Sequence, residues 1–134
     1  MATTITIPTL SKVRTYVKKN RISGCWDSWK RKNGDSVENF FAGNCHHASN
    51  ALSEMLVGSR RLVTRGWYTD TEALKDDPTW IRNKEGHIGH SWVEYEGKII
   101  DPTWWAFHPG EPVKVYVFDI DDPRYHTRNV NERV

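Results

Sequence analysis

Cysteine is scarce in this chain of 134 residues, which contains only Cys25 and Cys45. Two cysteines are too few for the dense disulfide framework of a small secreted domain, so we expect free thiols. No run of about 18 apolar residues occurs, so we expect no helix that spans a membrane. The first residues lack a basic segment followed by a long apolar one. We therefore expect no signal peptide, and a cytoplasmic protein.

The chain also lacks a large excess of positive or negative charge, because the net charge is only +2 and the isoelectric point is near 8.6. Such a balance gives little support to nucleic-acid binding. Basic residues do occur near Trp26 and Trp29, and acidic residues elsewhere in the chain offset them. A nucleic-acid-binding module is therefore a lesser alternative, and the basic residues that would carry it are Lys18, Lys19, Arg21, Lys30, Arg31, Lys32, Arg60 and Arg61.

Internal repeats, low-complexity tracts and linkers are absent, so the length predicts a single domain over residues 1–134. Its 7 Trp, 5 Tyr and 4 Phe provide large apolar areas for a core. We expect an N-terminal helix and loop over 1–35, the core over 36–120, and a peripheral polar tail over 121–134.

Hydrophobic periodicity predicts helices first and strands later. Helices are expected over 9–19 and 44–57, with one helical turn over 36–42. Strands are expected over 60–69, 87–95, 98–103 and 113–120. This order indicates an α+β fold in which a cysteine-bearing helix packs against an antiparallel sheet.

Cys45 falls in the first turn of the helix expected over 44–57. Asn44 is a residue type that commonly caps helices, and Gly58 is a plausible residue to end this one. The apolar side of the helix consists of Ala48, Ala51, Leu52, Met55 and Leu56. The N–H groups and dipole at a helix start favour a thiolate, which is the attacking form of cysteine.

His90 and Asp101 lie on the two strands that Glu96 and Gly97 connect. If these two residues form the turn, Asp101 is diagonal to His90 on the same face of the hairpin. A turn that is longer by one residue would separate them. Cys45, His90 and Asp101 then suggest a thiol nucleophile, its base and the residue that orients the base. Each of the three also has an ordinary structural explanation, as a core cysteine or a buried hydrogen-bonded pair.

Three segments resemble the core of the transglutaminase-like superfamily, which is related in fold to the papain-like cysteine proteases. They are Gly-Asn-Cys-His-His-Ala over 43–48, Gly-His-Ser-Trp-Val-Glu-Tyr over 89–95, and Gly-Lys-Ile-Ile-Asp-Pro-Thr over 97–103. The resemblance implies Cys45 as nucleophile, His90 as base and acid, and Asp101 as orienter. It also implies acyl transfer from an amide through a thioester, with no metal and no cofactor.

Acyl transfer needs donors for the oxyanion, and the Cys45 N–H is the natural first one. Asn39, Asn44, Trp26 and Trp29 are candidates for the second. His46 and Trp92 are expected to contact the substrate, which would be a peptide bond, a glutamine side chain or another small amide. Water is the expected acceptor, because a small domain has little surface for a second substrate. The main alternative is an inactive domain of the same fold that binds a protein partner.

Metal ligation is the remaining hypothesis, because Cys45, His46, His47, His87, His90 and Asp101 are ligand types for zinc. The spacing argues against it. Consecutive residues of a helix point about 100° apart, and residues three apart on a strand point to opposite faces. We therefore expect no metal site.

Overall fold

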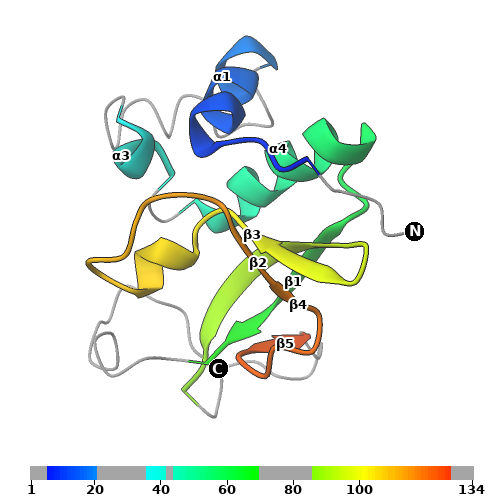
Figure 1. The fold of residues 1–134 in the computed structure, drawn as a ribbon, viewed down its shortest axis with the longest axis vertical. Coiled ribbons are helices and arrows are strands. Elements are labelled where there is room, and N and C mark those ends of the chain that lie inside the picture. The colour runs from blue at the N-terminus through cyan, green and yellow to red at the C-terminus, as the bar shows by residue number, and fades with distance from the viewer. Residues whose placement is uncertain (1–5, 21–35, 42–43, 70–85, 128–134) are drawn as a thin grey trace.

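Helices come first along the chain and strands follow, as the periodicity predicts. The computed structural model describes residues 6–20, 36–41, 44–69 and 86–127, and these form an α+β arrangement (Figure 1). The elements are α1 (Leu10–Asn20), α3 (Val37–Phe41), α4 (Cys45–Val57), β1 (Val63–Tyr68), β2 (Ile88–Tyr95), β3 (Lys98–Asp101), the 3-10 helix η3 (Trp104–Phe107), β4 (Tyr116–Asp119) and β5 (Tyr125–Thr127). No helix in the described residues is long and apolar enough to cross a membrane.

Helix α1 packs against α4 through a stripe of apolar side chains. Its Leu10, Val13 and Val17 are buried, at the spacing that places them on one side of a helix. Thr9 caps the helix, because its Oγ1 accepts a hydrogen bond from the Lys12 amide at 3.2 Å. The prediction for 9–19 is thus confirmed within one residue at each end.

Helix α4 carries Cys45 as its first residue and ends as expected. Gly58 adopts a left-handed conformation (φ 76°), and its N–H donates to the Glu54 carbonyl at 2.8 Å. Asn44 occupies the N-cap position, as predicted, but its side chain forms no capping hydrogen bond. The amide Nδ2 of Asn44 donates to the Phe40 carbonyl at 3.2 Å. The helix start is therefore not capped by this side chain.

The five strands form one antiparallel sheet in the order β4-β3-β2-β1-β5. Strands β2 and β3 pair with Tyr95 opposite Lys98 and Val93 opposite Ile100. Glu96 (φ 53°) and Gly97 (φ 72°) form the two-residue turn, and both have the positive φ that a type I′ turn requires. The even register that the predicted contact between His90 and Asp101 needs is confirmed.

The two faces of the curled sheet bury different clusters. Val93 and Ile100 pack with the apolar residues of α1 and α4. A second cluster contains Tyr68, Ile88, Trp104 and Phe107. His90 and Asp101 have the strand parity of this second cluster, because side chains alternate between the faces. The candidate pair thus shares a sheet face with aromatic residues.

The expectation of a peripheral tail over 121–134 is wrong for residues 125–127. They form strand β5, which pairs with β1 and places Tyr125 opposite Tyr68. A strand of three residues is too short to produce a detectable alternation in the sequence. The strand expected over 113–120 is also shorter than predicted, because β4 comprises only Tyr116–Asp119.

Candidate functional site

His90 and Asp101 form a hydrogen-bonded pair inside the protein. His90 Nε2 lies 2.7 Å from Asp101 Oδ2, and both side chains are 0% exposed. A buried charge is costly unless hydrogen bonds or opposite charges compensate it. Two further donors reach Asp101: the Thr103 amide at Oδ1 (3.0 Å) and the Tyr125 hydroxyl at Oδ2 (2.7 Å). The carboxylate is therefore held by three hydrogen bonds.

Tyr125 is a member of this site that the sequence reasoning missed. Burial raises the pKa of its hydroxyl well above the usual range, and the charge of Asp101 and the hydrogen bond to it raise the pKa further. The hydroxyl therefore stays protonated and remains a donor. Because it donates to the oxygen that also binds His90, it helps to fix the position of the carboxylate. No motif marks this tyrosine, which reaches the site only because β5 pairs with β1.

The other ring nitrogen of His90, Nδ1, is buried and forms no hydrogen bond of full geometry with any described residue. The Cys45 side chain nevertheless interacts with the ring. Burial alone lowers the pKa of His90, but the charge and hydrogen bond of Asp101 raise it by more, and a hydrogen bond and charge interaction with Cys45 add to this effect. The result is a pKa of about 10. At neutral pH His90 is therefore an imidazolium between Asp101 and Cys45.

Cys45 is a partly exposed, free thiol at the start of α4. Two hydrogen bonds attach this end of the helix to β2. His46 Nδ1 lies 3.2 Å from Ser91 Oγ, and Ser49 Oγ donates to the Ser91 carbonyl at 3.2 Å. Since Cys45 precedes His46 and His90 precedes Ser91, these bonds hold the thiol and the imidazole as neighbours.

Aromatic rings surround the imidazole of His90. The Phe107 ring lies edge-on at 4.7 Å between centroids, and the Trp92 ring lies at 5.7 Å. Trp92 is 1% exposed and its Nε1 donates to Glu94 Oε2 at 3.0 Å. The sequence predicts that Trp92 contacts the substrate, and in the structure its ring is buried beside His90. The other predicted substrate contact, His46, is half-buried and bound to Ser91.

The predicted oxyanion donors are only partly described. Asn44 uses one hydrogen of its amide for the Phe40 carbonyl. Trp26, Trp29 and the side chain of Asn39 lie outside the described residues, as does Cys25. The N–H groups of the first turn of α4 have no acceptors within the helix, so the Cys45 amide is a donor of suitable type.

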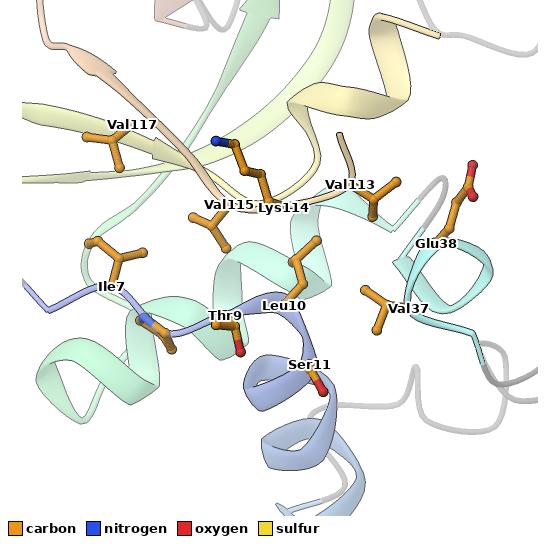
Figure 2. A pocket seen from close by; sticks show the side chains of 11 residues that line it. Ile7, Thr9, Leu10, Ser11, Val37, Glu38, Val113, Lys114, Val115 and Val117 are labelled. Carbon is orange, nitrogen blue, oxygen red and sulfur yellow. The ribbon is translucent and has the colours of Figure 1, made fainter. Parts of the chain in front are cut away.

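Metal-ligand groups and surface hollows are two further features that bear on this site. Within the described ranges, no group of three or more histidine, cysteine or acidic side chains is placed to hold a metal ion. A hollow of about 630 Å³ lies between the chain that leads into α1, helix α3 and the segment before β4 (Figure 2). Its lining includes none of Cys45, His90 and Asp101. The hollow is thus separate from the candidate site.

Comparisons with known proteins were made at three levels. No protein-family model, curated protein or solved structure gave a match to this chain.

Proposed function

We propose that this chain is a transglutaminase-like, cysteine-dependent acyl-transfer enzyme that hydrolyses an amide. The observation that carries the proposal is the fully buried His90, which is bound to Asp101 on one side and interacts with the Cys45 thiol. A nucleophile, an adjacent base and a third group that orients the base are the pattern of an activated nucleophile. The resemblance of residues 43–103 to the transglutaminase-like superfamily supports the same roles.

In the first half of the reaction, the thiol proton of Cys45 resides on His90 and the thiolate attacks the amide carbonyl. A C–S bond forms, and the carbonyl oxygen becomes an oxyanion. In this proposal the N–H groups at the start of α4 stabilise that oxyanion. The His90 imidazolium then donates its proton to the leaving nitrogen as the C–N bond breaks, which leaves a thioester on Cys45 and a neutral imidazole.

In the second half, water attacks the thioester and gives a proton to His90. The C–S bond breaks, the carboxylic acid leaves, and the thiolate and imidazolium are restored. Asp101 holds the ring through Nε2 in both halves, so that Nδ1 remains on the side of Cys45. The substrate is a peptide bond, a glutamine side chain or another small amide.

Alkylation by iodoacetamide tests the nucleophile without knowledge of the substrate. At pH 6.5 we expect Cys45 to react at least about tenfold faster than Cys25, because a neighbouring imidazolium favours the thiolate. The two rates are measured in the same sample by mass spectrometry of the labelled peptides. His90→Gln should slow the labelling of Cys45 by about tenfold or more.

His87→Gln is the matched control, because it removes an imidazole just before β2 and outside the site. It should leave the labelling rate of Cys45 within about twofold of the unmodified protein. Equal, slow labelling of both cysteines would contradict the proposal and would favour an inactive domain that binds a partner. A Cys45 rate that is insensitive to His90→Gln would also contradict it.

A further inference from the structure

A cluster of cationic and hydrogen-bonding side chains surrounds His46, the residue that follows Cys45. Arg65 of β1 stands directly opposite Ser91 of β2, and Ser91 Oγ is bound to His46. Directly opposed side chains of an antiparallel pair lie on the same face of the sheet. Arg65 therefore belongs to the same surface as His46, which is the residue after Cys45. The Arg65 side chain is exposed.

The charge of Arg65 is not neutralised by any carboxylate in the described part of the chain. The ion pairs found there join Arg60 to Glu54, Lys98 to Asp119 and Arg124 to Asp122, and His90 to Asp101. Arg60 is thus partly balanced, since its Nε lies 2.6 Å from Glu54 Oε2. Among the described residues, Arg65 therefore keeps an unbalanced positive charge on the surface that it shares with His46.

The two histidines that follow Cys45 respond to this charge. Burial lowers the pKa of His46, and Arg65 lowers it further. Burial likewise lowers the pKa of His47, and both Arg60 and Arg65 add to the effect. At neutral pH both rings are therefore neutral. The surface thus presents two uncharged imidazoles near the positive charge of Arg65.

We propose that the substrate of Cys45 carries a carboxylate close to its scissile carbonyl, and that Arg65 binds this carboxylate with His46 beside it. The inference rests on the proposed function and specifies its substrate class. Arginine suits the role because its planar group donates two parallel hydrogen bonds to a carboxylate. The buried Nδ1 of His90, which forms no hydrogen bond of full geometry with any described residue, marks where the reacting amide would lie.

The reach of the cluster limits where the charge of the substrate can be. Neighbouring positions on a sheet face and on a helix turn are about 5–6 Å apart. In this proposal the carboxylate of the substrate lies within reach of the Arg65 side chain while Cys45 attacks the carbonyl. An acyl group derived from an acidic residue, or one that ends in a free carboxylate, meets this condition.

Two alkylating reagents that differ mainly in charge test the proposal. Iodoacetate carries a carboxylate beside its reactive carbon, and iodoacetamide is its neutral analogue. The measurement is the rate with iodoacetate divided by the rate with iodoacetamide at Cys45. This ratio is compared with the same ratio for N-acetylcysteine amide. We expect the ratio at Cys45 to exceed that of the small thiol, and to fall by about threefold to tenfold in Arg65→Gln. High salt should lower the ratio in the unmodified protein, because it screens exposed charges.

Lys12→Gln is the matched control, because it removes one exposed positive charge on α1. Its ratio should equal that of the unmodified protein. Rapid iodoacetamide labelling with a ratio equal to that of the small thiol, unchanged in Arg65→Gln, would overturn this inference and leave the proposed function standing. Slow labelling by both reagents would instead overturn the proposed function, and the inference with it.

Discussion

At the scale of single residues, the candidate site depends on how a buried carboxylate is satisfied. Asp101 accepts hydrogen bonds from His90, from the Thr103 amide and from Tyr125. The donors come from a neighbouring strand, from the adjoining turn and from a strand near the end of the chain. If one is removed, an oxygen without access to solvent loses a partner that water cannot replace.

Tyr125→Phe should therefore lower the free energy of unfolding by about 1.5–3 kcal/mol, the range for hydrogen bonds to charged groups. Tyr116→Phe is the matched control, because its hydroxyl donates to the Pro112 carbonyl at an exposed position. It should cost less than about 0.5 kcal/mol. Urea denaturation of both variants measures the difference. Equal losses would show that the contact between Tyr125 and Asp101 does not stabilise the fold.

At the scale of elements, β1 is shaped to let β5 and Trp92 come close. A Cβ at Gly66 would meet the His126 carbonyl oxygen of β5, and Trp92 Cη2 at 2.6 Å. Gly66 lies opposite His90 in the pairing of β1 with β2. The missing side chain thus permits both the edge pairing that carries Tyr125 and the packing of Trp92 beside His90.

Gly66→Ala should destabilise the protein by about 3 kcal/mol or more, which exceeds the cost of Gly58→Ala, because backbone and a buried ring must both shift. It should also slow alkylation of Cys45 by iodoacetamide, since Trp92 packs against His90. Gly58→Ala is the matched control. It faces open space, and its cost of about 1–2 kcal/mol comes only from the left-handed conformation. If Gly66→Ala lowered the free energy of unfolding no more than Gly58→Ala and left the labelling rate of Cys45 unchanged, this account of β1 would be wrong.

At the scale of the whole molecule, the protonation of His90 is coupled to folding. The pKa of His90 rises from 6.5 to about 10 on folding, so the native state binds a proton that the unfolded state releases. Stability from this proton is fully present below pH 6.5 and is lost as pH rises through 10. The pair thus joins the chemistry of the site to the stability of the sheet.

The free energy of unfolding, compared with that of His90→Gln, should therefore fall as pH rises from 6.5 to 10. The slope should approach but not exceed about 1.4 kcal/mol per pH unit, which is the value for one proton. Denaturant titrations of both proteins at several pH values give the difference. A difference that stays constant over this range would contradict the raised pKa of His90.

The sequence by itself determined the local elements and the relation between His90 and Asp101. Both strands of their hairpin are adjacent in the chain, and the turn at Glu96 and Gly97 sets the parity that puts both side chains on one face. The periodicity of α4 likewise placed Cys45 at the helix start. Such features depend on neighbouring residues, whose spacing is visible in the sequence.

The tertiary structure decided which distant groups complete the site. Ser91 is joined to His46 across 45 positions, and Tyr125 to Asp101 across 24. Arg65 stands opposite Ser91 because β1 pairs with β2 in this register. Pairing between distant strands leaves no periodic signal in either partner. Only the tertiary structure therefore brings Tyr125 to Asp101, Cys45 to His90 and Arg65 to the surface that carries His46.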